Sequence, residues 1–386
     1  MKPIDEFLRH MMASAQRVRT GDPAAATEVI QRALQQAGLM PAGAETEQDE
    51  APTIIDLNPP PPGAQRATSA EAPSARKARA ERPGRPMPGA RPAWKRPPRP
   101  PADLGPGSFT EGMFACAEGR RRYRLYVPAS AANGPRPLVV MLHGCTQNAG
   151  DFAAGTAMNT VAEEHGCLVL YPEQDRSANH NGCWNWFEPG HQRASAGEPA
   201  IIAAMTRQIA AEHGADPKRV YAAGLSAGGA MAAILGAEYP DLYAAVGIHS
   251  GLAAGTGKDM ISGLHAMKHP PKPAAAGKGV PVIVFHGDAD HLVHPGNGEA
   301  VMKQFTGAQA AGGLQQQRHS GDAGGRSFTR TDWRDAQGRR VAAHWLVHGV
   351  GHAWVGGRAA GSHTDASGPC ASTEMLAFFL EQSRQS

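Results

Sequence analysis

Short apolar runs alternate with helical stretches in the part of the chain that follows Phe109. Several runs are apolar at successive positions, which is typical of strands that are buried on both faces. This alternation predicts an α/β fold with a mostly parallel central sheet flanked by helices. The expected strands are 123–127, 138–142, 168–171, 220–223, 244–248, 282–285 and 344–347, and the expected helices are 158–164, 199–212, 227–237, 298–305 and 372–381.

The first 40 residues have a different, helical pattern. Apolar residues from Ile4 to Val18 recur at spacings of three and four, which gathers them on one helix face. A second stripe starts after Asp22, a good N-cap residue, and Gly38 can end it. We therefore predict a helical hairpin over residues 1–40. Its apolar face could dock on the main domain, mediate self-association or bind a hydrophobic partner such as a granule surface.

Residues 41–107 are rich in proline and show little apolar periodicity. The stretch is acidic as far as Asp56, whereas 76–99 carries nine Lys and Arg against the single acid Glu81. Such a composition predicts a disordered or polyproline linker that is basic in its second half. The remaining residues, 108–386, form one expected catalytic domain, in which 253–278 resembles a surface insertion.

Charge and cysteine content exclude several classes of protein. The formal net charge is only +3 and the surplus lies on the linker, so nucleic acid is not an expected partner. No apolar run is long enough for a transmembrane helix, and no signal peptide is evident, so we expect a cytoplasmic protein, with export still open. The five cysteines lack the spacing of a zinc site, and their odd number leaves at least one thiol free.

The sequence Gly224-Leu225-Ser226-Ala227-Gly228 follows one expected strand and precedes one expected helix. A G-x-S-x-G sequence on such a strand-to-helix turn is typical of α/β-hydrolases, because small neighbours allow the strained turn that exposes the serine hydroxyl. We therefore expect Ser226 to be a nucleophile.

A serine nucleophile needs a base, and the base needs a carboxylate to orient it. In this fold the acid and then the histidine follow the serine along the chain. Asp290 is the preferred acid over Asp288, since it lies further beyond its strand, and Asp365 is a third option. His352, in a glycine-rich loop before the last helix, is the preferred base over His348 and His363.

The oxyanion of the tetrahedral intermediate needs two further donors. We expect them to be the backbone N–H groups of Ala227, directly after the nucleophile, and Cys145, in the loop after strand 138–142. No metal or organic cofactor is expected, because side chains and backbone donors suffice for each step.

From Phe109 to Glu381 the chain resembles the polyhydroxybutyrate depolymerase family of esterases, which also includes feruloyl and acetylxylan esterases. The resemblance rests on residues 143–147, 183–186, 224–229, 286–290 and 351–357. It implies the same triad, the same use of the Cys145 amide, and hydrolysis of carboxylic esters in hydroxyalkanoate chains. It also implies that Cys145 and Cys183 lie close together, and in a cytoplasmic protein we expect both to remain thiols.

The substrate is expected to be a soluble oligoester, an amorphous polymer granule or a smaller ester. Trp184, Trp186 and Trp354 are candidates for the walls of a substrate groove, with packing in the core as the alternative. Two other functions remain open: a feruloyl, acetylxylan or short-chain carboxylesterase, and a binding protein built on an inactive hydrolase fold.

Overall fold

The computed structural model describes residues 104–130, 134–270, 279–307 and 313–384. The predicted helical hairpin over 1–40 and the predicted linker as far as residue 103 lie outside the described residues. The last four residues of that predicted linker are described, and they belong to the main domain. The Leu104 carbonyl accepts a hydrogen bond from Asn159, and the Gly107 N–H donates to the Tyr126 hydroxyl. The domain therefore begins slightly before the expected boundary at 108.

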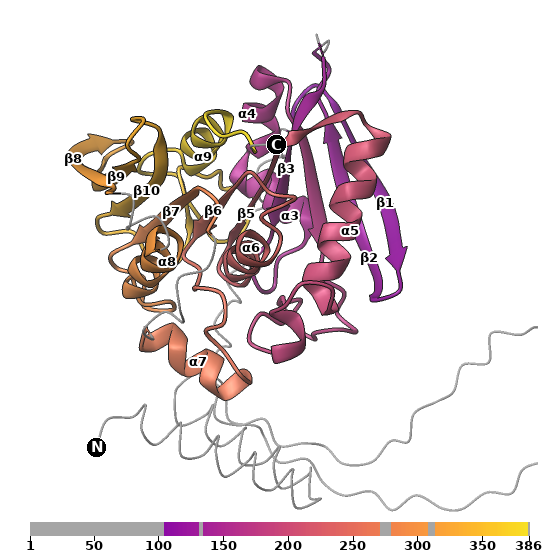
Figure 1. The fold of residues 1–386 in the computed structure, drawn as a ribbon, viewed down its shortest axis with the longest axis horizontal. Coiled ribbons are helices and arrows are strands. Elements are labelled where there is room, and N and C mark those ends of the chain that lie inside the picture. The colour runs from indigo at the N-terminus through magenta and orange to yellow at the C-terminus, as the bar shows by residue number, and fades with distance from the viewer. Residues whose placement is uncertain (1–103, 131–133, 271–278, 308–312, 385–386) are drawn as a thin grey trace, which may run out of the picture. The chain divides into compact units, whose positions relative to one another are not determined.

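The main sheet of the described residues has the strand order β1-β2-β4-β3-β5-β6-β7-β10-β9-β8 (Figure 1). A separate two-stranded sheet pairs β11 (Trp354–Val355) with β12 (Thr364–Asp365). The strands from β4 to β10 in this order are parallel, and antiparallel strands extend the sheet at both edges. The expected parallel sheet is thus confirmed. The strands are β1 Ser108–Cys116, β2 Gly119–Val127, β3 Arg136–Leu142, β4 Leu168–Glu173, β5 Ala215–Leu225, β6 Ala245–His249, β7 Val282–Gly287, β8 Gln315–Ala323, β9 Arg326–Arg334 and β10 Arg340–Val347.

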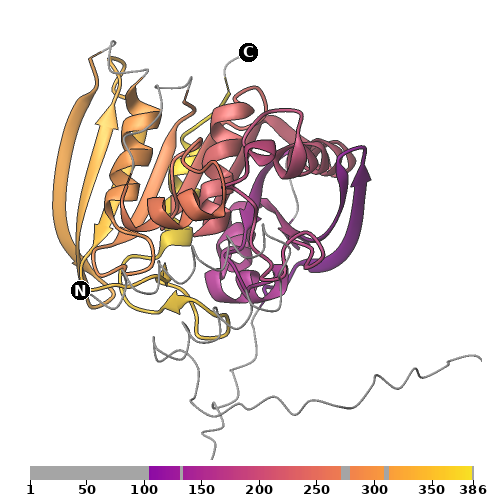
Figure 2. The same ribbon diagram turned by 90° about the horizontal axis from the view of Figure 1, so that it is seen from below.

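Helices cover both faces of the sheet (Figure 2). On one face lie α5, α6 and α8, and on the other lie α3, α4 and α9. A further helix, α7, follows β6 in the segment expected to be a surface insertion. The helices are α3 Ala149–Thr156, α4 Met158–His165, α5 Gly197–Glu212, α6 Ala227–Glu238, α7 Met260–Lys268, α8 Gly296–Gly307 and α9 Ala371–Leu380.

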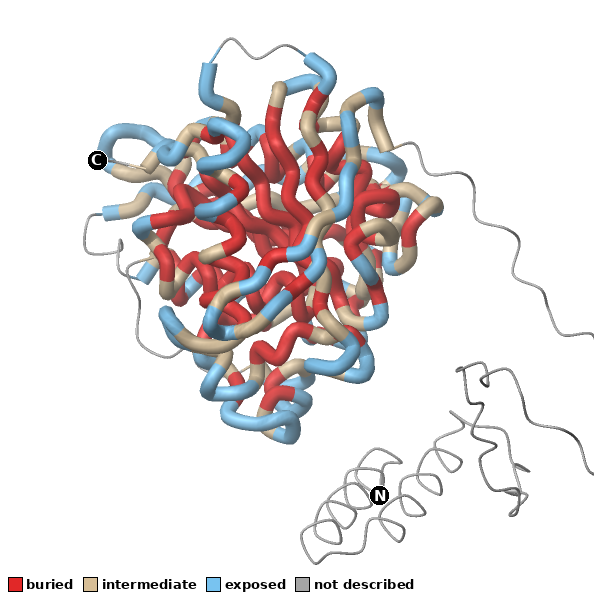
Figure 3. The backbone as a smooth tube through the Cα atoms, turned by 90° about the vertical axis from the view of Figure 1, so that its right-hand side faces the viewer, coloured by how far each residue is buried: buried red, intermediate tan, exposed pale blue. Residues whose placement is uncertain are grey.

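Successive residues of each central strand enter different cores. In β3, Leu138 and Val140 belong to the core cluster that includes residues of α5 and α6, whereas Val139 and Met141 belong to the cluster that includes residues of α3 and α9. Side chains alternate between the faces of a strand, so a strand covered on both sides must be apolar at every position. Figure 3 shows the resulting buried interior within an exposed shell.

Every expected strand and helix is present, with ends that shift by a few residues. The strands β1, β8 and β9 and the helices α3 and α7 were not predicted. β8 reads QQQRHSGDA and is largely exposed, so it has no apolar pattern from which a strand could be inferred. Within the described ranges, no helix combines the length and the apolar character needed to cross a membrane.

Candidate active site

Ser226 occupies the sharp turn between β5 and α6. Its φ of 57° and ψ of −118° form a strained backbone conformation for a residue other than glycine. A Cβ at Gly228 would lie 2.0 Å from the Leu142 carbonyl oxygen, and a Cβ at Gly224 would lie 2.4 Å from Gly228. The glycines are therefore required by close backbone contacts, as the sequence motif predicted.

Asp290 and His352 form a hydrogen-bonded pair. The Nδ1 atom of His352 lies 2.7 Å from Oδ2 of Asp290. The aspartate side chain is fully buried, whereas the histidine side chain keeps 12% of its surface exposed. A carboxylate on Nδ1 fixes the imidazole with Nε2 as the free acceptor, which is the tautomer that a general base requires.

Several donors hold Asp290 in its ionised form. Burial alone would raise the pKa of this carboxyl group, but hydrogen bonds from His286 and His352 outweigh burial and hold its pKa well below the usual range. The Asp290 Oδ1 atom also accepts the N–H groups of Leu292 and Val293. His286 was quoted in the sequence motif without a role, and its Nε2 lies 3.5 Å from Asp290 Oδ2.

The other acids and histidines considered from the sequence have different partners. Asp288 pairs with His348, with 2.8 Å between Oδ2 and Nδ1. Asp365 lies 3.4 Å from Arg326, and His363 lies 3.4 Å from the Thr146 hydroxyl. Asp288–His348 and Asp290–His352 are thus neighbouring pairs, and of these two only Asp290–His352 includes a fully buried carboxylate.

His249, at the end of β6, connects the serine turn to the histidine loop. Its carbonyl oxygen accepts the Ser226 N–H at 2.9 Å, and its ring Nε2 accepts the Val355 N–H at 3.1 Å. Val355 follows His352 by three residues, so these bonds bring the histidine loop beside the serine. His249 could not be recognised from the sequence, because no local pattern distinguishes it from the other 16 histidines.

The loop after β3 lies against the serine turn. A Cβ at Gly144 would lie 3.6 Å from the Ser226 Cβ atom, and Cys145 is the next residue. Gln147 holds this loop, because its Oε1 accepts the Gly144 N–H while its Nε2 donates to Asp151 and to the Ser362 carbonyl. Ala227 is the first residue of α6, where backbone N–H groups have no partner within the helix. Both expected oxyanion donors therefore flank Ser226.

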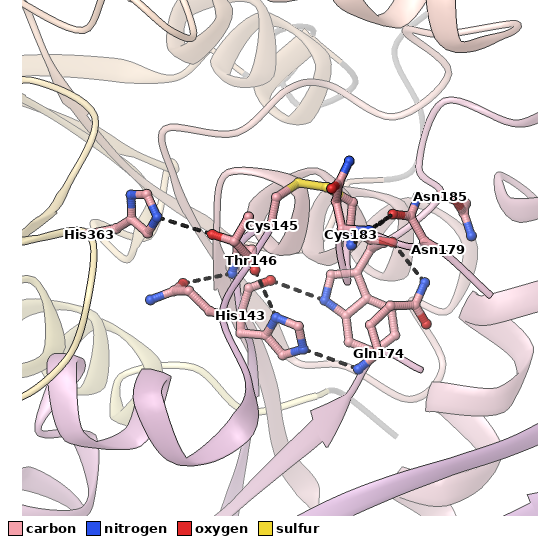
Figure 4. Close-up of a disulfide and its surroundings, with 12 residues drawn as sticks. His143, Cys145, Thr146, Gln174, Asn179, Cys183, Asn185 and His363 are labelled. Carbon is pink, nitrogen blue, oxygen red and sulfur yellow. Dashed lines mark hydrogen bonds between the residues drawn. A yellow bond between two sulfur atoms is a disulfide. The ribbon is translucent and has the colours of Figure 1, made fainter. Parts of the chain in front are cut away.

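Cys145 and Cys183 are joined by a disulfide (Figure 4). The implied proximity of the two residues is confirmed, but the expectation that they remain thiols is wrong in this structure. The Cys183 carbonyl accepts a hydrogen bond from Gln174, and the Thr146 N–H donates to the Asn181 carbonyl. The disulfide and these bonds fix the Cys145 loop against the segment that carries Cys183. Among the described cysteines, Cys116, Cys167 and Cys370 are free.

The three tryptophans proposed for a substrate groove belong to the core. Trp184 and Trp354 are fully buried, and Trp186 keeps 6% of its surface exposed. Trp184 donates from its indole to the His143 carbonyl, and Trp354 donates to the Ser372 hydroxyl while stacking on His249. With so little exposed surface these rings do not form the walls of an open groove, and the structure places all three in the core.

A pocket of about 440 Å³ opens on the far side of the acid. It is lined mainly by residues of the loop after β7 and by β10, including Asp290 and His344. Ser226 and His352 do not line it. We therefore do not assign this pocket to the reacting ester.

A parallel sheet with a serine on the turn after β5, an acid after β7 and a histidine after β10 defines an α/β-hydrolase. An acetyl xylan esterase from Aspergillus awamori has this fold, with a TM-score of 0.53 at 21% identity over 72% of this chain and 97% of that one. The family model described as "Esterase PHB depolymerase" matches residues 121–324. The chain belongs to this family.

Two curated relatives are depolymerases by name. Poly(3-hydroxyalkanoate) depolymerase C of Paucimonas lemoignei is 32% identical over 247 residues, which is 58% of this chain and 56% of the relative. Poly(3-hydroxybutyrate) depolymerase of Ralstonia pickettii is 31% identical over 284 residues, which is 66% of this chain and 57% of the relative. The chain thus spans little more than half the length of these two relatives.

Proposed function

We propose that this protein hydrolyses carboxylic esters through an acyl-enzyme intermediate. The observation that carries the proposal is the buried Asp290–His352 pair, held beside the Ser226 turn through His249. In this proposal His352 Nε2 takes the proton of Ser226 as its Oγ attacks the ester carbonyl carbon. The proton then passes to the departing alkoxide oxygen, which leaves as an alcohol.

The second half of the reaction uses the same groups. Water attacks the acyl carbon, His352 again takes a proton, and the Ser226 oxygen leaves with that proton restored. The N–H groups of Ala227 and Cys145 hold the oxyanion in both halves. Asp290 stays ionised and orients the imidazole, in keeping with the many hydrogen bonds that it accepts.

We propose hydroxyalkanoate esters, as oligomers or amorphous polymer, as the substrate class. The names of the two depolymerase relatives support this choice. A feruloyl, acetylxylan or short-chain carboxylesterase is the alternative within the class. Comparison of kcat/KM for hydroxybutyrate oligomers, methyl ferulate, acetylated xylan and p-nitrophenyl esters of two to about ten carbons distinguishes these substrates. Preference for oligomers supports the proposal, and preference for ferulate or acetylxylan contradicts it.

A binding protein on an inactive hydrolase fold is the alternative from another class. It predicts no turnover of any ester in this panel and no covalent labelling of Ser226 by a fluorophosphonate. Mass spectrometry of a tryptic digest after labelling answers this directly, since an activated serine gains the mass of the phosphonyl group.

We also propose that residues before Phe109 attach the enzyme to polymer granules, on the basis of the apolar stripe that includes Phe7 and Met11. Co-sedimentation of the full chain with amorphous polyhydroxybutyrate tests this, and equal sedimentation of a chain that starts at Asp103 contradicts it.

The cytoplasmic location stays a proposal. Alkylation and mass spectrometry of Cys145 and Cys183 from the native host test it, because a stably bridged pair favours export.

A further inference from the structure

His249 is fully buried between aromatic rings, and the proposed reaction makes no chemical use of it. Its ring stacks on Phe285 at 5.8 Å and on Trp354 at 5.0 Å between ring centroids. Its two strongest polar contacts go to different parts of the site: the carbonyl oxygen binds the Ser226 N–H, and ring Nε2 binds the Val355 N–H. A single residue thus contacts both the nucleophile and the loop of the base.

Hydrogen-bond chemistry fixes the tautomer of this ring. An amide N–H can only donate, so Nε2 must be the unprotonated acceptor toward Val355. The ring proton then lies on Nδ1, 3.2 Å from the Ser250 hydroxyl, which can accept it. Burial, together with the nearby His286 and His352, lowers the pKa of His249 well below its ordinary value. The ring therefore stays neutral near neutral pH and keeps Nε2 as its acceptor.

Loss of the Nε2 acceptor would affect the histidine loop first. Val355 is fully buried in the short strand β11 (Trp354–Val355), which pairs with β12 (Thr364–Asp365). Its N–H would be left without a partner in the core, so the loop would have to shift to satisfy it. His352 lies three residues away, and a displacement of about 1 Å at a catalytic group can lower a rate by about a hundredfold.

We propose that His249 is a positioning residue, which holds the Ser226 turn and the His352 loop in register through its carbonyl oxygen and its ring Nε2. The proposal rests on the proposed function, since it assigns His249 a role in the ester hydrolysis carried out by Ser226 and His352. It concerns the step at which His352 accepts the serine proton, so it predicts an effect on kcat rather than on KM.

Two amide side chains test the position of the acceptor. The oxygen of His249→Gln can reach the place of Nε2, whereas the oxygen of His249→Asn can reach only that of Nδ1. We expect H249N to lower kcat on p-nitrophenyl butyrate by about ten- to a hundredfold with KM within about twofold. H249Q should recover most of the lost rate. His249→Phe, which keeps the stacking and removes the acceptor, should resemble H249N.

The matched control is Tyr243→Phe, which removes a buried hydroxyl 3.0 Å from Thr206 Oγ1, just before the opposite end of β6. It should lower the melting temperature and leave kcat unchanged. Hydrogen exchange at the Val355 amide, measured by mass spectrometry, should be faster in H249N than in wild type and near wild type in H249Q. Equal kcat and equal exchange in H249N and H249Q would overturn the proposal.

The failure of the two proposals can be told apart. If wild-type protein hydrolyses no ester, the proposed function fails, and the exchange measurement still decides whether His249 holds the loop. If wild type is active and H249N and H249F match its kcat, only the positioning role fails.

Discussion

Asp288 and Asp290 lie two residues apart, and each binds a different histidine, so residue identity alone does not distinguish them. The surroundings of the two carboxylates distinguish them. Asp288 keeps 40% of its side chain exposed and pairs with the exposed His348, whereas Asp290 is fully buried. A buried carboxylate stays ionised only when several donors satisfy it, and Asp290 accepts two backbone N–H groups besides its histidine contacts. This difference supports the proposal that Asp290 is the acid that orients His352.

The first prediction compares the two aspartates directly. Asp290→Asn should lower kcat by about a thousand- to ten-thousandfold, because an amide stabilises the wrong tautomer of His352 and cannot stabilise the imidazolium. Asp288→Asn serves as the matched control and should lower kcat less than about tenfold. Steady-state kinetics on p-nitrophenyl butyrate gives both numbers, and a larger loss in D288N than in D290N would reverse the assignment.

At the scale of elements, the loops at the carboxyl ends of β3, β5, β6, β7 and β10 build the site. The strand-turn-helix geometry around Ser226 depends on the contact between Gly228 and the Leu142 carbonyl. Glycine at this position lets α6 begin close to the end of β3, which brings the Ala227 N–H beside the Cys145 loop.

Gly228→Ala tests this contact, because the contact decides whether the substitution raises or lowers the free energy of unfolding. Alanine in a helix is intrinsically favoured over glycine by about 1 kcal/mol, so an unhindered site would gain stability. Because the added Cβ would meet a backbone oxygen at 2.0 Å, we expect G228A instead to lower the free energy of unfolding by more than about 3 kcal/mol. Gly190→Ala, with no atom within 4 Å of the added Cβ, should change it little. Urea denaturation distinguishes these outcomes.

The disulfide gives a second prediction at this scale. It closes a loop with a sequence separation of 38 residues, for which the loss of chain entropy in the unfolded state stabilises the fold by about 2–4 kcal/mol. Cys183→Ala keeps the Cys145 amide but frees its loop, so both the melting temperature and kcat should fall. Cys370→Ala, which removes a free thiol, is the control. An unchanged melting temperature in C183A would show that the pair is not bridged in solution.

The central elements were predictable because their side chains must satisfy two cores at once. β3, β4 and β7 are apolar at nearly every position, a pattern typical of strands covered on both faces. The edge strands β8 and β9 carry mainly polar residues and pair through the backbone, which leaves no periodic pattern. The triad candidates followed from motif and chain order. The three tryptophans were misjudged because closeness in sequence to Cys183 and His352 does not reveal which way a ring points.

For the whole molecule, buried neutral histidines couple stability to pH. Burial lowers the pKa of His143, lowers that of His249 well below its ordinary value and lowers that of His344 to about 4. Below about pH 6.5 the unfolded chain binds protons at these sites that the native state does not, so the free energy of unfolding falls as the pH falls. Asp290, whose pKa is depressed, stabilises the fold above about pH 4, and this contribution is lost below that value.

We therefore expect the free energy of unfolding to fall between pH 7 and pH 5, by about 2 kcal/mol from His344 alone. A further fall should follow below about pH 4 as the unfolded state begins to bind a proton at Asp290. Urea denaturation at intervals of one pH unit measures both phases. Stability that is constant from pH 7 to pH 5 would contradict the neutral, buried state of these histidines.

The central claim is that Ser226 is the nucleophile of an ester hydrolase, and Ser226→Ala tests it most directly. The substitution removes only one oxygen atom from the turn, so the melting temperature should change little. Without the nucleophile only the oxyanion donors and substrate binding remain, and kcat/KM on p-nitrophenyl butyrate should fall by about a thousandfold or more. A folded S226A protein that hydrolyses this ester at a rate near that of wild type would contradict the account.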